Sequence, residues 1–189
     1  MNILYLLPVA TQPRYLKRVE CLAHAGANSH ICYFKRDYFI GKDLPEGSVC
    51  LGKIEHGRYI KRFLTLIISA CTLMKHRSNG DVVYCFGLDM LFFAFIIGLF
   101  LNKKIIYEVS DVQGLVLSRT ILSRIARAIE KFLLMRVDIL VATSPNYIEG
   151  YYHDILNINI MRSVVIENKL NKAQFSWIKT RNEPRATRT

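Results

Sequence analysis

The chain has 189 residues, 51% of them apolar, and its 26 Lys and Arg outnumber 15 Asp and Glu to give a formal net charge of +11. This composition fits one globular domain with a substantial core, and it excludes disordered, collagen-like and disulfide-scaffold proteins. The positive charge favours an anionic partner, such as phosphates, nucleic acid or an anionic membrane surface, without choosing among them.

The five cysteines are odd in number, at least 11 residues apart and without a C-x-x-C pair, so they indicate neither a metal site nor a redox motif. Four of them, Cys21, Cys32, Cys71 and Cys85, lie in apolar periodic segments, where a free Cys behaves as a small hydrophobic residue. We therefore expect a reducing, cytoplasmic environment.

Three apolar stretches need to be tested as targeting or membrane segments. The apolar start of the chain has no Lys or Arg before it, which argues against a signal peptide. Phe63–Met74 and Met90–Leu101 are runs of twelve residues, shorter than the roughly 20 residues that span a bilayer. We expect both to form buried or interfacial helices.

Short apolar runs alternate along the chain with longer segments of helical periodicity. The expected strands are Ile3–Leu7, His30–Phe34, Ser48–Leu51, Asp81–Phe86, Lys104–Val109, Ile139–Thr143 and Ser163–Ile166. The expected helices are one that starts near Pro13 and ends at Gly26, followed by Tyr59–His76, Leu88–Leu101, Ser118–Arg136 and Pro145–His153. Ser118 is a candidate N-cap. Lys35–Gly47 is expected to be a loop.

Strands that are continuously apolar are typical of a parallel sheet covered by helices on both faces. The expected fold is therefore α/β: a Rossmann-like, doubly wound, mostly parallel sheet of about seven strands in a single domain. We place this domain at residues 1–171 and a basic polar tail at 172–189. Such sheets bind ligands at the carboxyl ends of their strands, so the loops after the strands are the segments to search for function.

The motifs of several common enzyme classes are absent. The first loop, Pro8–Gln12, contains no glycine, so the G-x-G-x-x-G cradle of dinucleotide sites is missing, and so is the P-loop. The zinc-binding H-E-x-x-H and the G-x-S-x-G nucleophile turn are missing as well. We expect no metal and no organic cofactor.

Five segments, in this order along the chain, are similar to segments of the N-terminal domain of GT-B fold glycosyltransferases of the family 4 type. They are Met1–Leu7 (MNILYLL), Asp81–Leu91 (DVVYCFGLDML), Lys103–Asp111 (KKIIYEVSD), Ile129–Ser144 (IEKFLLMRVDILVATS) and Val164–Asn168 (VVIEN). The resemblance covers about residues 1–170. It implies the acceptor-side half of an enzyme whose C-terminal domain holds a nucleotide sugar.

The chain departs from the family pattern at several positions. Pro8–Gln12 replaces the glycines that often follow the first strand, Ser110 stands where the family has a histidine, and Asn168 is followed by Lys169 instead of glycine. No two glutamates have the eight-residue separation of the donor domain's pair, and only 18 residues follow Asn171. We expect this chain alone to be inactive and to need a donor-domain subunit or the continuation of a longer chain.

Loop positions and the resemblance together give six candidate site residues. Asp111 is the candidate catalytic residue, because a carboxylate after the fifth strand is placed to accept a hydrogen bond from an acceptor hydroxyl or a donor sugar. The candidate substrate-binding residues are Arg14, Ser110, Asp89, Ser144 and Asn168.

Each of these positions also has a structural interpretation. Asp111 is equally suited to capping the next turn, Asp89 to capping a helix that starts at Met90, and Ser144 to capping the helix after it. Among the few basic residues in the loops after the strands, Arg14 is the best placed to bind a diphosphate. Glu108, inside its strand, is interpreted as a core carboxylate with satisfied hydrogen bonds.

The segment Ser118–Arg136 predicts an amphipathic helix. Its apolar face contains Ile121, Ile125, Ile129, Phe132 and Leu133, and its basic face contains Arg124, Arg127 and Lys131. The basic face is either simply solvated or docks on anionic lipid beside a lipid-linked acceptor. Basic and aromatic residues also alternate in Tyr33–Phe39, but no recognition motif accompanies them, so we expect no nucleic-acid partner.

These observations favour transfer of a sugar from a nucleotide sugar to a saccharide or lipid-linked acceptor in cell-surface polysaccharide biosynthesis. The nucleotide sugar would bind only with a donor domain present. The expected location is the cytoplasm, peripheral on the inner face of the cytoplasmic membrane. The alternative is a non-catalytic binding module or a truncated remnant of a glycosyltransferase.

Overall fold

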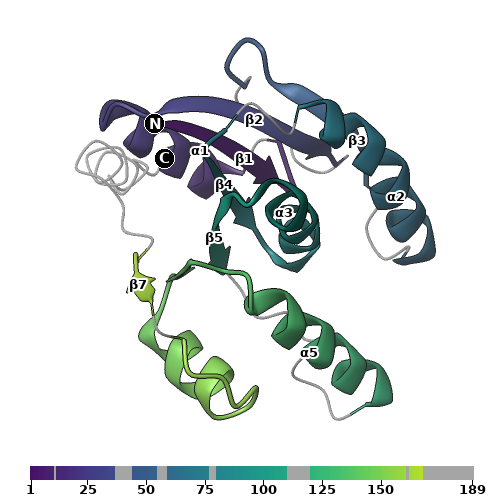
Figure 1. Cartoon of the computed structure of the whole chain (residues 1–189), viewed down its shortest axis with the longest axis vertical. Coiled ribbons are helices and arrows are strands. Elements are labelled where there is room, and N and C mark those ends of the chain that lie inside the picture. The colour runs from purple at the N-terminus through teal and green to yellow at the C-terminus, as the bar shows by residue number, and fades with distance from the viewer. Residues whose placement is uncertain are drawn as a thin grey trace, which may run out of the picture.

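The computed structural model describes residues 1–10, 12–36, 44–54, 59–76, 80–109, 120–160 and 162–167. Within these ranges the strands are β1 (Asn2–Leu7), β2 (Asn28–Lys35), β3 (Val49–Lys53), β4 (Val82–Phe86), β5 (Lys104–Val109), β6 (Ile139–Ala142) and β7 (Ser163–Val165). They form one sheet in the order β3-β2-β1-β4-β5-β6-β7, with every neighbouring pair parallel (Figure 1). The predicted Rossmann-like, seven-stranded parallel sheet is confirmed.

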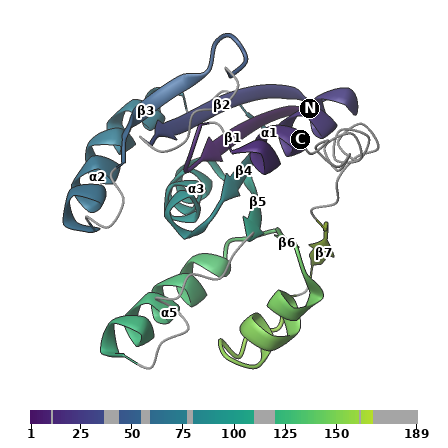
Figure 2. The ribbon, with the colours of Figure 1, turned by 180° about the vertical axis from the view of Figure 1, so that it is seen from behind.

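Helices cover both faces of this sheet (Figures 1 and 2). They are α1 (Pro13–His24), α2 (Tyr59–Lys75), α3 (Leu88–Leu101), α5 (Ile121–Leu134) and the π-helix η1 (Tyr147–His153). Tyr15 and Val19 of α1 pack on one face, whereas the other four helices contribute to the larger core cluster on the opposite face. Burial on both sides explains why β1 has five consecutive buried residues instead of an alternating pattern.

Helix α3 is the most deeply buried of these helices, with Met90, Phe93 and Ile97 in the core. Its Gly98 lies against β5, where an added Cβ would stand 2.7 Å from the Cδ1 atom of Ile105. Glycine thus lets this helix approach the sheet closely. Across the described ranges, none of the helices has the length and apolar character needed to cross a bilayer.

The start of α5 differs from the prediction. The helix begins at Ile121, and its N-cap is Thr120, whose Oγ1 accepts a hydrogen bond from the Ser123 amide at 3.2 Å. The prediction of Ser118 as the cap is wrong, and Ser118 itself lies outside the described residues. Two hydroxyl residues precede the apolar periodicity, and the pattern alone did not distinguish them.

All five cysteines are free thiols. Cys32 and Cys85 are buried, and burial raises the pKa of Cys32 to about 11. Cys21 and Cys71, which also stand in segments of apolar periodicity, are exposed on α1 and α2.

Candidate functional site

Three helices begin at the edge of the sheet formed by the carboxyl ends of its strands. Helix α1 follows β1, α3 follows β4, and the turn that leads to η1 follows β6. The start of a helix carries a partial positive charge and unpaired amide groups, which favour anionic groups. The order of the strands reverses between β1 and β4, and in open parallel sheets ligands bind beside such a switch point.

Arg14 lies at this edge, in the first turn of α1. Its guanidinium donates a hydrogen bond to the Tyr15 hydroxyl at 3.2 Å and lies 5.0 Å from the centre of the Tyr15 ring. The Tyr15 ring packs in turn on Phe86, the last residue of β4, at 4.4 Å between ring centres. Arg14 is therefore held over the junction of β1 and β4.

Asp89 lies in the first turn of α3 and does not cap it. The helix begins at Leu88, and Gly87 is its N-cap without a side-chain hydrogen bond, so the alternative of an Asp89 cap on a helix starting at Met90 is wrong. An acidic residue in the first turn still stabilises the positive end of the helix. Gly87 has φ of +78°, and no atom of the described residues lies within 4 Å of the position that its Cβ would take.

Ser144 precedes the helical turn that begins at Pro145. Its Oγ accepts a hydrogen bond from the Asn146 amide at 3.3 Å, and its carbonyl oxygen accepts one from the Tyr147 amide at 3.2 Å. Ser144 thus caps the turn before η1, whereas the N-cap of η1 itself is Asn146, without a side-chain hydrogen bond. A role of Ser144 toward a ligand stays a prediction.

The structure brings Arg14, Asp89 and Ser144 to one edge of the sheet. The remaining three candidates, Ser110, Asp111 and Asn168, lie outside the described residues. Strand β5, which precedes the first two, ends at this edge with Val109.

A buried ion pair lies beneath this edge. Glu108, fully buried in β5, accepts hydrogen bonds from Arg18 of α1, Nε to Oε2 at 2.9 Å and Nη2 to Oε1 at 3.2 Å. The Tyr84 hydroxyl donates to the same carboxylate at 2.5 Å. Glu108 is thus the satisfied core carboxylate that the sequence predicted, whereas its partner Arg18 was missed. The amphipathic pattern of α1 gave no sign that one of its basic residues turns inward.

The contact with Glu108 also raises the pKa values of Arg18 and Tyr84. Burial acts to lower the pKa of Arg18, but the hydrogen bond and the charge of Glu108 more than compensate and raise it. Burial and the adjacent Glu108 raise the pKa of Tyr84 as well, so its hydroxyl stays protonated and donates. The Gly87 amide donates to the Glu108 carbonyl oxygen at 3.2 Å, which links the pair to the turn before α3.

A second buried carboxylate, Glu130 of α5, accepts hydrogen bonds from two hydroxyls of η1. Tyr151 donates to its Oε2 at 2.5 Å and Tyr152 to its Oε1 at 3.2 Å. Burial raises the pKa of Glu130, and the two hydrogen bonds reduce that increase. No local sequence pattern indicated this network, because Glu130 is 21 and 22 residues from its two partners. In the described part of the chain, no group of three or more His, Cys, Asp or Glu side chains is arranged to hold a metal ion.

No family model matches the chain. The succinoglycan biosynthesis protein ExoL of Rhizobium meliloti is 27% identical over 181 residues, a match that covers 90% of this chain and 43% of that protein. Sucrose-phosphate synthase from Thermosynechococcus elongatus superposes with a TM-score of 0.64 at 15% identity, covering 90% of this chain and 49% of the synthase.

Two further structures share the fold. UDP-GlcNAc 2-epimerase from Methanocaldococcus jannaschii has a TM-score of 0.56 at 14% identity, with 88% of this chain and 45% of the epimerase covered. Acinetobacter baumannii MurG has a TM-score of 0.52 at 10% identity, with 98% of this chain and 50% of MurG covered. This is the fold of one half of a GT-B glycosyltransferase. The resemblance carried by the five sequence segments is confirmed. The chain spans about half or less of the length of each of these proteins.

Proposed function

We propose that the chain is the acceptor-side half of a GT-B glycosyltransferase that transfers sugar from a nucleotide sugar to a saccharide or lipid-linked acceptor in cell-surface polysaccharide synthesis. The observation that carries this proposal is the match to a succinoglycan biosynthesis protein over 90% of the chain, on a GT-B fold. Residues 1–171 are the folded half in this proposal, and residues 172–189 are a basic polar tail.

The proposed roles follow from the carboxyl edge of the sheet. Asp111 is the catalytic carboxylate, which accepts a proton or a hydrogen bond from the acceptor hydroxyl. The proposed substrate-binding residues are Arg14, Ser110, Asp89, Ser144 and Asn168. The departing nucleotide diphosphate needs preorganised positive charge, and one half of a cleft supplies little of it. We therefore assign nucleotide-sugar binding to the complete cleft, with a donor domain present.

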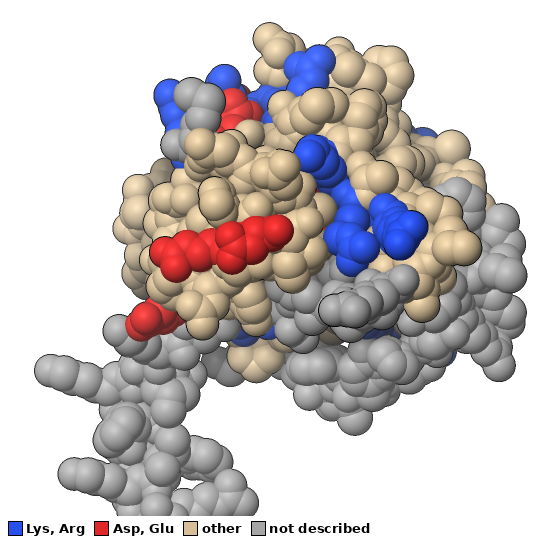
Figure 3. Space-filling model, turned by 90° about the horizontal axis from the view of Figure 1, so that it is seen from below, with Lys and Arg blue, Asp and Glu red and all other residues tan. Residues whose placement is uncertain are grey.

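We further propose a peripheral position on the inner face of the cytoplasmic membrane, where a lipid-linked acceptor would be found. Helix α5 supports this, because its apolar residues Ile121, Ile125, Ile129 and Phe132 are all about half exposed or more. Arg124 and Arg127 lie on the same helix. Seen from below, basic side chains gather on one part of the molecule and acidic side chains on another (Figure 3). A helix with an exposed apolar face and adjacent cations suits an anionic lipid surface.

Binding experiments test whether the chain is the acceptor half or the donor half of the enzyme. The 189-residue chain is titrated with nucleotide sugars and, separately, with lipid-linked saccharides. We expect the saccharides to bind and Asp111→Asn to weaken that binding. The control Asp154→Asn changes a surface carboxylate paired with His153 and should leave binding unchanged. Tight binding of the nucleotide sugar without binding of the saccharide would assign the chain to the donor side.

The alternative function is a non-catalytic saccharide-binding module or a truncated remnant. The observation that favours it is the coverage, since the chain corresponds to only 43% of ExoL and about half of the structural neighbours. Addition of a donor-domain protein separates the two proposals. A transferase half gains activity from the addition, and a binding module does not.

A further inference from the structure

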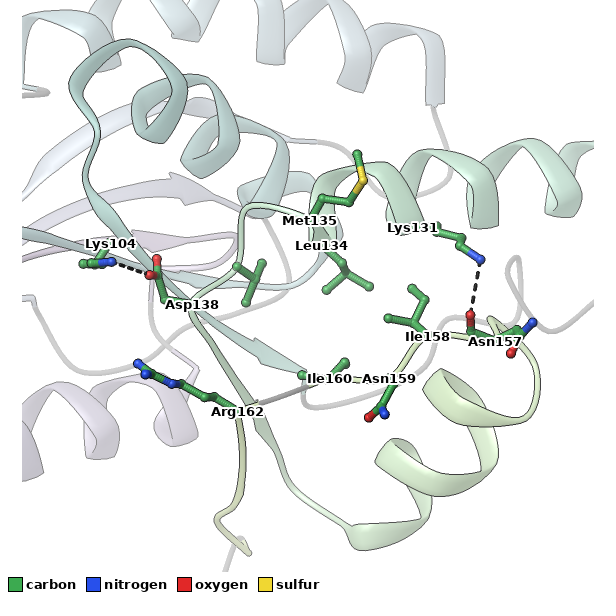
Figure 4. Close-up of a pocket in the computed structure, with 11 residues that line it drawn as sticks. Lys104, Lys131, Leu134, Met135, Asp138, Asn157, Ile158, Asn159, Ile160 and Arg162 are labelled. Carbon is green, nitrogen blue, oxygen red and sulfur yellow. Dashed lines mark hydrogen bonds and ion pairs between the residues drawn. The ribbon is translucent and has the colours of Figure 1, made fainter.

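A cavity of about 730 Å³ lies at the opposite edge of the sheet, where β5, β6 and β7 begin (Figure 4). It is lined by the last turn of α5, by the segment before β6 and, before β7, by residues 157–160 and Arg162. Its volume falls within the range of about 300–1,000 Å³ that is usual for small-molecule sites. The proposed glycosyl-transfer role does not use this edge.

The cavity has cationic ends and an apolar middle. Lys104 and Arg162 lie at one end and Lys131 at the other, with Leu134 and Ile158 between them (Figure 4). The Lys131 ammonium donates to the carbonyl oxygens of Leu156 and Asn157, both at 3.3 Å. These acceptors are neutral, so they orient Lys131 and anchor the loop without cancelling the positive charge.

One carboxylate, that of Asp138, lines the cavity, and its hydrogen bonds are already made. It accepts from the Lys104 ammonium at 2.9 Å and from the Ile105 amide at 2.8 Å. Burial acts to raise the pKa of Asp138, but these hydrogen bonds and the charges of Lys104 and Arg162 lower it overall. Asp138 therefore stays ionised and neutralises Lys104, which leaves Arg162 without an ion pair in the described part of the chain.

A neighbouring cavity of about 260 Å³ shares Lys104 and Asp138 and adds Lys103 and Arg136 to the lining. Together the two cavities have five cationic side chains and one carboxylate, a balance of +4. A concave surface with one sign of charge and apolar walls concentrates its field and attracts an anion. Arginine binds phosphate oxygens through paired hydrogen bonds, which makes a phosphate group well suited to the Arg162 end.

We propose that this cavity binds a phosphate ester, with its phosphate at Arg162 and its carbon body along Leu134 and Ile158. The side chains of Asn157 and Asn159, which also line the cavity, are placed to bond hydroxyl groups of that body. The site is separate from the proposed transfer site at the carboxyl edge. A soluble sugar phosphate and a phospholipid headgroup share this chemistry.

The test uses the 189-residue chain and two variants with the same change in charge. Arg162→Glu reverses a cation of the cavity, and Lys75→Glu reverses an exposed cation at the end of α2. Binding of glucose 1-phosphate, inorganic phosphate and glucose is measured by calorimetry. Circular dichroism verifies that both variants fold. We expect glucose 1-phosphate to bind better than inorganic phosphate and glucose not to bind, with a loss of about tenfold or more in Arg162→Glu and less than about twofold in Lys75→Glu.

Flotation with phosphatidylglycerol and phosphatidylcholine vesicles identifies the source of the phosphate. If binding to the phosphatidylglycerol vesicles is lost in Arg162→Glu and glucose 1-phosphate does not bind, the ligand is a phospholipid headgroup. Equal losses in the two variants would mean a general effect of net charge and would overturn the proposal. Absence of binding by both glucose 1-phosphate and phosphatidylglycerol vesicles would overturn it as well.

Discussion

Arg18 and Glu108 are 90 residues apart in the sequence, yet their side chains form a buried ion pair between α1 and β5. The exposed fractions of the two side chains are 15% and 1%. Removing one member of such a pair leaves the other charge in a poorly solvated place, which is more costly than losing an exposed pair. The pair therefore matters for the stability of the fold.

We predict that Glu108→Gln lowers the free energy of unfolding by about 3 kcal/mol, because the Arg18 charge loses its partner. Glutamine keeps one oxygen that can accept from Tyr84 and Arg18 Nε, while its NH2 group stands where an oxygen accepts from Arg18 Nη2, so the variant removes the charge and one hydrogen bond. Urea denaturation measures the change. Asp154→Asn is the matched control, since its carboxylate is exposed and pairs with His153 at the surface. Equal stability of Glu108→Gln and the parent chain would show that the ion pair contributes nothing.

Glu130 gives stability a dependence on pH. Its folded pKa is raised above the ordinary value of 4.5, mainly by burial, so the folded state holds this proton more tightly than the unfolded state does. The stabilisation from this group is complete below the unfolded pKa and is lost as the pH rises through the raised folded pKa.

Glu130→Gln replaces the carboxyl by a group that resembles its protonated form and does not titrate. We predict that the difference in unfolding free energy, parent minus variant, decreases from about pH 4 to about pH 8. Thermal or urea unfolding of both proteins at a series of pH values measures it. Other groups titrate equally in the two proteins and cancel in the difference. A difference that stays constant or increases with pH would contradict the assignment.

At the scale of single elements, the predicted apolar face of helix α5 is only partly buried. Its period predicted a helix with one apolar and one basic face, and the helix forms at Ile121–Leu134. Leu133 and Leu134 are buried, whereas Ile121, Ile125, Ile129 and Phe132 remain exposed. Phe132 touches α3 through Phe95, with 5.2 Å between ring centres. Within the described residues, α5 packs through residues such as Ser123, Ala126 and Leu133, and Ile121, Ile125 and Ile129 of the apolar face are left exposed.

Membrane binding through α5 is tested by Ile125→Asp, with Ile68→Asp on α2 as the matched control. Both isoleucines are exposed, 52% for Ile125 and 73% for Ile68. We predict that Ile125→Asp weakens flotation with anionic vesicles several-fold, because the interface loses apolar contact and gains a repelled carboxylate. Ile68→Asp should bind as the parent chain does, and binding should fall with added salt. Equal losses in the two variants would place the lipid surface elsewhere.

At the scale of the molecule, the chain spans about half of its structural neighbours, 49% of sucrose-phosphate synthase and 50% of MurG. In the proposed function it supplies one wall of a cleft, in which Arg14 and the helix starts at the carboxyl edge would face a diphosphate. Such a half site lacks most of the preorganised charge that stabilises the leaving group.

We therefore predict that the purified 189-residue chain does not transfer sugar by itself and that transfer appears when a donor-domain protein is added. The assay follows labelled sugar from nucleotide sugars to saccharide or lipid-linked acceptors. In the reconstituted system, Asp111→Ala should abolish transfer while Asp154→Asn retains it. Turnover by the chain alone that disappears in Asp111→Ala would mean that a complete site lies within one sheet.

Much of this fold could be predicted from local pattern. The apolar runs placed all seven strands within a few residues, and Pro13 and the Leu88–Leu101 run marked α1 and α3, because burial on both faces leaves a pattern in the adjacent residues themselves. The Thr120 cap was missed because neighbouring hydroxyl residues carry the same local preference. The candidate site was predicted through loop positions, which the strand order brings to one edge.

The sequence by itself determined the class of the fold, the direction of the sheet and the resemblance to a GT-B half, since these depend on composition, periodicity and short segments. Only the tertiary structure decided that Arg18 meets Glu108, that Tyr151 and Tyr152 meet Glu130, and that three cations surround one cavity at the far edge. The physical reason is that a charge or hydroxyl shows its partner only when distant segments pack together. A helical period likewise cannot say which part of an apolar face will be covered, because that depends on the neighbouring elements and not on the helix.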